Sequence, residues 1–486
     1  MKKLLLVCIA LPILFCCCNS SQKAGIDSDF IEMSAEVLGD KIRGGLVAQI
    51  LGNLNGIPHE NKYYETGGNV QQYTPSLPDG AYTDDDTDIE WVYIYSMQNN
   101  KTTMLSPDKI TDLWKRYMNK NVWCSNKYAR LLMDLNIKPP LTGNVHLNPW
   151  ANFNISGQFI CESFGLVAPA MPQTAAATGL NYTHVTIDAE PAQATQLFTS
   201  MIAAAFITDD IEKIIDAGAA SIDKKSQLVQ IVKDVRSWHK QYPGDWRKTR
   251  GLVKDKYAIH GDRTRNQNGY EVCTASTIAA LLYGQGDLVK TLIAAFNFGW
   301  DADNNAATAA TIIGVIKGYE WIEKQGWQIK DVYKNTSREG MPTDETITSL
   351  GDRLIDVAEN VIIENGGSKL ETNGEVIYRI KKQKPAIIEK LPDTDRQFTG
   401  LQKRYSPQIT AGLKSKSTQK QAKAAYLAIC LGLADKIRSE NPEGWTNANQ
   451  ALYNYPELVK AMFNSPSDYG KRLRDKAIKA ELKKPD

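Results

Sequence analysis

The segment FNFGWDADNNAATAATIIGVIKG (296–318) decides the fold of this chain. Its second half places small residues four apart, on one face of a helix: Ala306, Ala310, Gly314 and Gly318. The segment IRGGLVAQILGNLNG (42–56) repeats the pattern at Gly44, Ala48, Gly52 and Gly56. Such a face lets another backbone approach closely. We therefore expect tightly packed helices at the centre of a domain.

Acidic residues stand where two apolar helices should begin. Asp301 and Asp303 precede the helix after residue 304, and the window DGAYTDDDTDIE (79–90) holds six acids without Lys or Arg. Carboxylates this close repel one another, so some stay protonated or share a cation. Asp and Asn oxygens with no nearby His or Cys suit Mg²⁺, Mn²⁺ or Ca²⁺. The sequence predicts a divalent-metal site built from two distant helix starts, in which a shared acid bridges two ions.

Two simpler explanations exist for these acids. Asp88 and Asp303 could cap helix N-termini, and the first cluster could be a solvated acidic loop. One cap needs one carboxylate, however, and each cluster holds more. A solvated loop also does not explain Asp301 and Asp303 among Phe298, Trp300 and small residues, because buried acids need partners. Metal-assisted hydrolysis is the chemistry that these residues fit best.

Length and composition bound the class of protein. The chain has 486 residues, 42% hydrophobic and 23% charged, as in an ordinary globular protein. Its net charge of +2 is too small to create a strong positive electrostatic field that would attract nucleic acid, so we expect no nucleic-acid partner. Zinc chemistry is disfavoured because the five histidines include no HExxH, and four scattered cysteines (124, 161, 273 and 430) leave disulfide pairing open.

The N-terminus has the features of an export signal. Met1-Lys2-Lys3 and the apolar run after it precede three cysteines, which resembles a bacterial lipoprotein signal. Cys17 is the expected lipidation site, because it places Leu14 at −3 and small Cys16 at −1. A plain signal peptide or an uncleaved anchor is the alternative. We expect a lipid-anchored protein of the bacterial cell envelope, facing the periplasm or the exterior, with no other membrane contact.

The rest of the chain is predicted to be helical, with one extended stretch, GEVIYRI (374–380). Helices are expected at 42–56, 88–98, 105–118, 191–206, 208–221, 225–239, 270–283, 287–297, from 306 onward, and at 346–367. The predicted organisation is a signal peptide (1–16), a lipidated tether (17–34), a catalytic domain (35–370), a connector with a short strand (371–395) and a C-terminal helical region (396–486). Motifs for nucleotide-binding loops and for the serine elbow are absent.

Four segments, in order, resemble the ADP-ribosylglycohydrolases, which are all-α hydrolases with a two-magnesium centre. They are KIRGGLVAQILGNLNGIPHE (41–60), YTDDDTDIEW (82–91), YTHVTIDAEPAQATQLFTSMIAAAF (182–206) and FNFGWDADNNAATAATIIGVIKG (296–318). The resemblance spans about 40 to 367. It implies an all-α, orthogonal multi-helix bundle, here with a small, mostly helical C-terminal extension.

The resemblance also implies site residues. With Asp84 in place of a ligand threonine, the metal ligands are Asp84, Asp85, Asp86, Asp301, Asp303 and Asn304, the last replacing another threonine. The other register makes Thr83, Asp84 and Asp85 the trio. The catalytic residues are Glu60, Asp85 and Asp303, and the ions are two Mg²⁺ or Mn²⁺.

Two further residues bear on the substrate. Trp300 replaces a glycine beside the metals and would stack on the substrate or narrow the pocket, and His184 matches a family histidine. Asn53 replaces an aspartate. His184 as a satisfied structural residue and Glu60 as a surface acid remain the alternatives.

The expected activity is metal-dependent cleavage of an N- or O-glycosidic bond to ADP-ribose or a related ribosyl or glycosyl substrate. An exported protein would rarely meet ADP-ribosylated cytosolic proteins, so free nucleosides, nucleotide-sugars or other glycosides are the alternative substrates. A non-catalytic ligand-binding or structural lipoprotein on the same fold is the second hypothesis, since the family includes crystallins. A calcium-stabilised adhesion module is the third.

Overall fold

The computed structural model describes residues 29–485. They form a helical body with small sheets, so the predicted all-α fold is confirmed. The helices of the main body (residues 29–381) are α1 (Ala35–Gly56), η1 (Ile57–His59), α2 (Asp85–Asn100), α3 (Pro107–Tyr117), α4 (Cys124–Asp134), η2 (Leu141–Gly143), α5 (Ser156–Phe159), α6 (Glu162–Leu166), α7 (Pro172–Thr183), α8 (Glu190–Ala205), α9 (Ile211–Ala220), α10 (Gln227–Gln241), α11 (Trp246–Tyr257), α12 (Arg263–Gln267), α13 (Tyr270–Gly284), α14 (Leu288–Phe298), α15 (Ala302–Lys317), α16 (Tyr319–Glu323) and α17 (Ile347–Glu364). A helix is present at each segment where the sequence predicts one.

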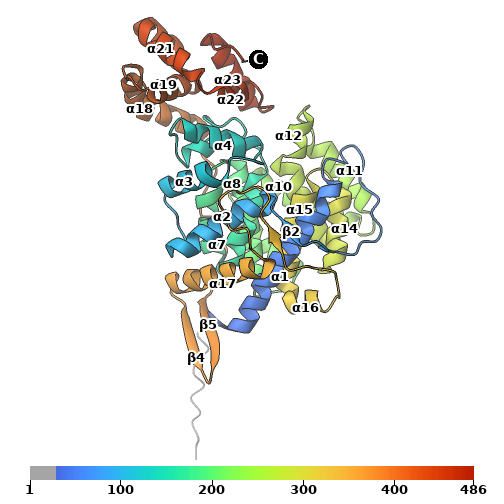
Figure 1. The fold of residues 1–486 in the computed structure, drawn as a ribbon. Helices are drawn as coiled ribbons and strands as arrows, with labels where there is room; N and C mark the ends of the chain where they lie inside the picture. Colours follow the sequence, from blue (N-terminus) through green and yellow to red (C-terminus); the bar gives the residue numbers. More distant parts are fainter. Residues whose placement is uncertain (1–28, 486) are drawn as a thin grey trace, which may run out of the picture.

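The two stripes of small residues pack against each other, as Figure 1 shows for α1 and α15. A Cβ added at Gly44 would lie 2.5 Å from the carbonyl oxygen of Gly314, and one at Gly52 would lie 2.5 Å from that of Ala306. Real side chains never come so close, so only small residues permit this helix pair. The helices run antiparallel, because the end of α1 meets the start of α15. The buried core of the main body surrounds this pair.

The described residues also form two small sheets. Strands β1 (Phe30–Ser34), β5 (Glu375–Lys381) and β4 (Ser368–Thr372) form an antiparallel sheet in the order β1-β5-β4. Phe30 pairs with Lys381 and Ser34 with Ile377, while Ser368 pairs with Arg379. Strands β2 (Ala81–Tyr82) and β3 (Tyr333–Lys334) form a parallel pair.

The first sheet changes two of the expected domain boundaries. Residues 30–34, expected as the end of the tether, belong to the folded body because their backbone pairs with β5. The predicted strand at 374–380 is β5, and it has partners on both sides that the sequence did not reveal. The connector is therefore reduced to the segment after Lys381.

The C-terminal region (residues 394–482) has a core of its own. Its helices are α18 (Thr394–Leu413), α19 (Thr418–Cys430), α20 (Ala434–Glu440), α21 (Pro442–Leu452), α22 (Pro456–Met462) and α23 (Asp468–Lys479). This core also takes in side chains of α4 and of the segment after it, including Tyr128, Leu132 and Leu147. Figure 1 shows these helices stacked over α4, so the region is fixed to one end of the main body.

No helix within residues 29–485 is long and apolar enough to cross a membrane. Cys17 and the predicted signal peptide lie outside the described residues.

Candidate metal centre

The packing of α1 against α15 brings the two acidic clusters together. A Cβ added at Gly56, the last residue of α1, would overlap the Cα of Asp303 in the first turn of α15. Asp301 is the N-cap of α15, and Asp84 is the N-cap of α2. Neither side chain makes a capping hydrogen bond. Asp88 and Asp303, the two residues that the capping explanation named, lie inside the first turns of α2 and α15, so neither of them is the N-cap residue.

The clusters line one cavity of about 420 Å³. Its acidic wall consists of Glu60, Asp84, Asp85, Asp86, Asp301 and Asp303. Its other wall comes from Asn61, Trp123, Cys124, Asn126, Asn154, Ile155, Phe159, Gln267 and Asn268. Six carboxylates thus face a single space large enough for a small molecule.

Within this cavity the acids form two groups that share one residue. One carboxylate oxygen each from Glu60, Asp301 and Asp303 lie within 4.8 Å of one another, and the same holds for Asp84, Asp86 and Asp303. Asp303 is 5% exposed, and its Oδ1 atom has no hydrogen-bond partner. A buried carboxylate oxygen without a donor is costly, and a cation removes that cost. The donor set, all carboxylate oxygen, is the kind that hard divalent cations prefer, and Asp303 is common to both groups.

The electrostatics agree with this arrangement. Burial and the charge of Asp303 raise the pKa of Asp86 well above its ordinary value. Burial and the charge of Asp301 do the same to the pKa of Asp303. Burial also raises the pKa of Asp84 and of Asp301. These groups cannot all be ionised together without nearby positive charge, which bound divalent cations would supply.

Two asparagines supply hydrogen-bond donors to the group that contains Asp86. Asn53 Nδ2 donates to Asp84 Oδ2 at 3.1 Å and to Asp86 Oδ2 at 2.7 Å. Asn304 Nδ2 donates to Asp86 Oδ1 at 3.0 Å. The side-chain oxygen of Asn304, Oδ1, accepts from Gln158 Nε2 at 3.0 Å. Asn304, expected as a metal ligand through that oxygen, therefore orients Asp86 instead, because Gln158 holds its oxygen away from the acids.

The structure favours one register of the acidic motif. The Thr83 hydroxyl pairs with that of Thr336 at 2.7 Å, and Thr83 does not line the cavity. Asp84 and Asp86 converge on Asp303, as expected if the motif begins at Asp84. Asp85 lines the cavity but belongs to neither group, and burial raises its pKa well above the ordinary value.

Glu60 is half-buried, lines the cavity and belongs to the first group of acids, so the surface-acid alternative fails. It follows η1, and Asn61 Nδ2 donates to its Oε1 atom at 2.6 Å. Burial, with the charges of Asp301 and Asp84, raises its pKa to about 7. A carboxyl group with this pKa can hold or release a proton near neutral pH, as a general acid or base requires.

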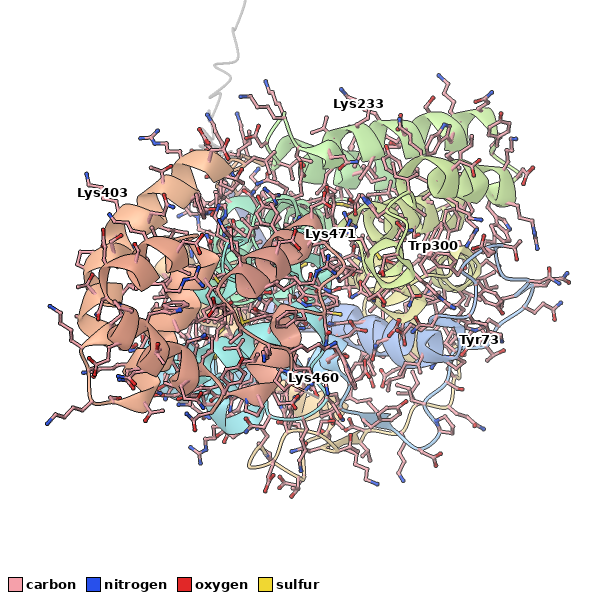
Figure 2. All side chains as sticks on the ribbon, turned by 90° about the horizontal axis from the view of Figure 1, so that it is seen from above. Tyr73, Lys233, Trp300, Lys403, Lys460 and Lys471 are labelled. Atoms are coloured by element: carbon pink, nitrogen blue, oxygen red, sulfur yellow. The ribbon has the colours of Figure 1, made fainter. Side chains whose placement is uncertain are left out.

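Trp300 does not have the position predicted from the sequence, which was beside the metals and next to the substrate. Its side chain is fully buried, and it does not line the cavity; Figure 2 labels it within the body. The Arg250 guanidinium lies 4.2 Å from the ring centroid, and the Trp300 carbonyl accepts from the Asn61 backbone at 3.0 Å. Trp300 adopts φ +57° after Gly299 at φ +75°. It therefore supports the Glu60 and Asp301 loops, and its buried ring is not placed to contact a ligand in the cavity.

His184 is also outside the cavity. Its Nε2 atom pairs with Glu389 at 2.9 Å, and its Nδ1 atom lies 3.1 Å from the Ile187 carbonyl. His184, Glu389 and Asp188 could together hold a metal ion. Asp188, however, already accepts from the Ala189 backbone and from Asn144. The expected substrate contact is therefore wrong, and the structural alternative for this histidine holds.

The structure reveals several residues at the site that the sequence analysis did not identify. Asn268 donates to Asp301 Oδ2 at 2.8 Å, and Arg338 forms a buried ion pair with Asp88 at 2.7 Å. Trp123 lines the cavity and is 60% exposed. The polar run RNQN (265–268) was a usable signal for Asn268. The sequence holds no such signal for Arg338 or Trp123, because only tertiary contacts give these two residues a role at the site.

All four cysteines in the described part of the chain are free. Cys124 lines the cavity, where burial and the charges of Asp301 and Asp85 raise its pKa to about 12. The thiol stays protonated at neutral pH, so it is a poor nucleophile.

The sequence matches a known protein family. A search of curated proteins found no match to the chain. Residues 33–362 match the family described as ADP-ribosylglycohydrolase, and this span contains both acidic clusters, Glu60 and the α1–α15 pair. It covers about two thirds of the sequence and ends before the C-terminal region. The chain therefore belongs to the ADP-ribosylglycohydrolase family.

Proposed function

We propose that this protein is a glycohydrolase with two divalent ions, Mg²⁺ or Mn²⁺, that cleaves an N- or O-glycosidic bond to ADP-ribose or a related ribosyl or glycosyl group. The observation that carries the proposal is Asp303, whose carboxylate is shared by two converging groups of acids and keeps one buried oxygen without a partner. Family membership supports hydrolase chemistry of this type.

The residues of the chain have distinct roles in this proposal. Glu60, Asp301 and Asp303 would hold one ion, and Asp84, Asp86 and Asp303 would hold the other. Bound ions would orient sugar hydroxyls, polarise the leaving group and activate a water. Glu60 exchanges a proton at its carboxylate, because its pKa of about 7 leaves both forms available near neutral pH. Asn268 and Asn53 fix the orientations of Asp301 and of Asp84 and Asp86.

One observation favours a second candidate, a ligand-binding protein without turnover. Both oxygens of Asp86 accept amide N–H groups, from Asn53 and Asn304. These neutral donors stabilise the Asp86 carboxylate in part without an ion, and they occupy oxygen lone pairs that an ion would otherwise use. Binding of sugars without release of product would support this candidate.

The test has two parts, one that measures metal binding and one that measures turnover. Mg²⁺ and Mn²⁺ should raise the melting temperature of the native protein, and Asp303→Asn should remove this effect because it weakens both groups at once. Asp344→Asn, a change at an exposed position, is the matched control. If neither ion changes the melting temperature of the native protein, the proposed two-ion centre is contradicted.

The turnover part of the test uses ADP-ribosyl, nucleoside and simple glycoside substrates. Release of free sugar that is lost in Glu60→Gln but kept in Glu443→Gln, at an exposed position of α21, supports the enzyme. Metal binding without sugar release from any of them supports the ligand-binding candidate.

The cell-envelope location is part of the proposal. It rests on the lipoprotein-like sequence around Cys17, and it directs the choice of substrates towards molecules found outside the cytoplasm.

A further inference from the structure

A cavity of about 270 Å³ lies between the main body and the C-terminal region. The main body supplies His146 and Pro149, from the segment that follows η2, and the C-terminal region supplies side chains from α18, α19 and α23. No residue of this lining also lines the metal cavity. Most of the lining lies beyond residue 362, so the family match does not include it.

The two walls of this cavity are held in a fixed relative position. Tyr426 on α19 donates to the carbonyl of Leu147, and Ser465 donates to the carbonyl of Pro149 at 2.9 Å. Both acceptors belong to the segment that forms the main-body wall. Figure 1 shows α18, α19 and α23 grouped at the same end of the molecule, next to α4. The cavity is therefore a permanent feature of the contact between the two parts of the chain.

One face of α23 lines the cavity. Tyr469, Arg472, Leu473 and Lys476 are separated by three or four positions, so they share one side of the helix. Two of these residues are basic, and neither forms an ion pair with a carboxylate among residues 29–485. This face therefore places two positive charges beside an apolar surface.

The ammonium group of Lys476 is held in place but keeps hydrogen-bond donors available. Its Nζ atom donates to the carbonyl of Cys430 at 2.7 Å and lies 4.8 Å from the centroid of the Phe398 ring. The neutral carbonyl takes one of three N–H groups, and the ring contact does not cancel the charge. Burial lowers the pKa of Lys476, and the positive charge of Arg472 adds to this effect, so the two cations occupy the same region. A bound anion would offset both effects.

Arg472 has a similar arrangement at the more exposed side of the cavity. Its guanidinium lies 4.5 Å from the centroid of the Tyr469 ring, and its Nε atom donates to the carbonyl of Asp468 at 3.3 Å. Its terminal N–H groups make no further hydrogen bond to the described residues, and they form the fork that binds carboxylate and phosphate groups. Asp395 is the one carboxylate of the lining, and it is exposed and pairs with neither cation. The lining therefore has a net positive charge.

The rest of the lining is mostly apolar and aromatic. The centroid of the His146 ring lies 5.0 Å from that of Phe398 and 5.6 Å from that of Tyr469. Its Nε2 atom pairs with the carbonyl of Thr394 at 2.9 Å, which fixes the ring. Burial lowers the pKa of His146 below 6.5, so this ring is neutral at neutral pH. An apolar or aromatic part of a ligand fits against these rings.

Positive charge is concentrated in the C-terminal region as a whole. Residues 394–482 contain fifteen Lys and Arg against eight Asp and Glu, an excess of seven, whereas the whole chain has an excess of two. The rest of the chain is therefore net acidic. A basic surface around the cavity raises the local concentration of anions.

We propose that this cavity binds a small organic anion, whose phosphate or carboxylate group contacts Lys476 and Arg472 and whose apolar or aromatic body lies against Phe398 and Tyr469. The site is separate from the metal cavity, and it does not depend on the proposed glycohydrolase function. Because the ligand contacts both walls, its binding stabilises the contact between the main body and the C-terminal region. The C-terminal region is thus a ligand-binding module.

The experiment measures binding to the full chain by calorimetry, in the presence of a metal chelator and at constant ionic strength. Without divalent ions the six carboxylates of the metal cavity do not attract anions, so the measurement reports on the other site. The probes are phenyl phosphate and benzoate, which distinguish a phosphate ligand from a carboxylate ligand. Inorganic phosphate and acetate lack the ring, and benzyl alcohol lacks the charge.

The variants Arg472→Gln and Lys476→Gln each remove one charge from the lining. Their matched controls are Arg474→Gln and Lys471→Gln, which remove the same charges from α23 at exposed positions outside the lining; Figure 2 labels Lys471. The melting temperature of each variant without ligand shows whether it folds. Arg472 is exposed, so its variant keeps the test valid if Lys476→Gln loses stability with its bond to Cys430.

The expected result is that at least one aromatic anion binds about tenfold more tightly than its counterpart without a ring and than benzyl alcohol. Arg472→Gln and Lys476→Gln should each weaken this binding by about tenfold, because each removes a charge-assisted hydrogen bond, and the controls should leave it unchanged. The tighter of the two aromatic probes then identifies the acidic group of the ligand.

Four results would overturn the site. They are no binding of either aromatic anion at millimolar concentration, equal binding of the anions without a ring, equal binding of benzyl alcohol, and a loss of binding in the control variants as large as in the lining variants. The last result would assign the binding to the general positive charge of the surface. None of them bears on the glycohydrolase proposal, which is tested by metal-dependent turnover.

Discussion

Gly56 at the end of α1 lies directly against Asp303 at the start of α15, with no room between them for even one methyl group. Asp303 is also the residue that the two groups of acids share. The packing of the fold and the position of the metal centre are therefore controlled at the same point. A change in helix packing here would therefore move Asp303, the residue proposed to hold both ions.

Gly56→Ala should disturb both stability and metal binding. Overpacking at a site without space costs about 1 to 3 kcal/mol, and the shift of Asp303 should reduce thermal stabilisation by Mg²⁺. The measurement is urea unfolding with and without Mg²⁺. Gly400→Ala on α18 is the matched control, because no atom lies within 4 Å of its added Cβ. That variant should gain about 0.5 to 1 kcal/mol. A normal Mg²⁺ response in Gly56→Ala would contradict the coupling.

Asn53→Asp should make the protein more dependent on metal. It removes the amide donor to Asp84 and Asp86 and adds a carboxylate to an acidic site. Without divalent ions the free energy of unfolding should fall by about 1 to 3 kcal/mol, and Mg²⁺ should restore more stability than in the native protein. Urea unfolding measures both, with Asn447→Asp at an exposed position of α21 as the control. Equal Mg²⁺ effects in variant and native protein would show that Asn53 does not influence the ions.

Arg338→Met should be strongly destabilising. Arg338 and Asp88 are both fully buried, and the guanidinium also serves two backbone carbonyls in the Trp123 loop. Leaving Asp88 without its partner costs about 3 to 5 kcal/mol. The double variant Arg338→Met with Asp88→Asn should recover part of this loss, because the isolated charge is gone. Chemical unfolding of both single variants and the double variant gives the coupling energy. Additive effects would indicate that the pair acts as two independent residues.

The His184–Glu389 pair should make stability fall as pH rises through about 9. Burial alone lowers the pKa of His184, but the hydrogen bond and charge of Glu389 outweigh it and raise the pKa to about 9, from an ordinary 6.5. The folded protein thus holds this proton more tightly than the unfolded chain. The contribution is complete below pH 6.5 and declines between pH 6.5 and 9.

Its size is about 1 to 2 kcal/mol, because the partly exposed Glu389 carboxylate is screened by water. At Glu389 burial raises the pKa, but the hydrogen bond and charge of His184 outweigh it and lower the pKa below the ordinary 4.5. The stability that this carboxylate contributes is therefore lost as the pH falls below 4.5. The measurement is unfolding free energy against pH. Glu389→Gln should flatten the decline between pH 6.5 and 9, and an unchanged profile would assign that decline to other groups.

Cys17→Ala should abolish lipidation. Metabolic labelling with palmitate in a bacterial host should mark the native chain and lose the mark in this variant, while Cys18→Ala keeps it. Cys16→Ala retains a small residue at −1 and should still be labelled. Labelling that depends on Cys16 would move the acceptor by one residue, and no labelling of any form would favour a plain signal peptide.

The sequence predicted the class of fold because its strongest signals are local and periodic. Small residues four apart on 42–56 and 306–318 predicted close helix packing, and the structure has these two faces in contact. The partners of β5 were missed because β1 and β4 are short and only pairing stabilises them. The acids were predicted as a cluster because six of them in one window exceed the needs of capping.

By itself, then, the sequence determined the helical fold, the close central pair and the acids that form the site, since these depend on periodicity and on local charge. Tertiary structure decided what those residues contact. In the folded protein Asn304 is hydrogen-bonded to Gln158, the buried Trp300 ring packs against Arg250, and His184 pairs with Glu389. Tertiary structure also placed α22 of the C-terminal region beside α4. The physical reason is that a side chain's role depends on neighbours distant in the chain, and no local pattern encodes which neighbours will meet.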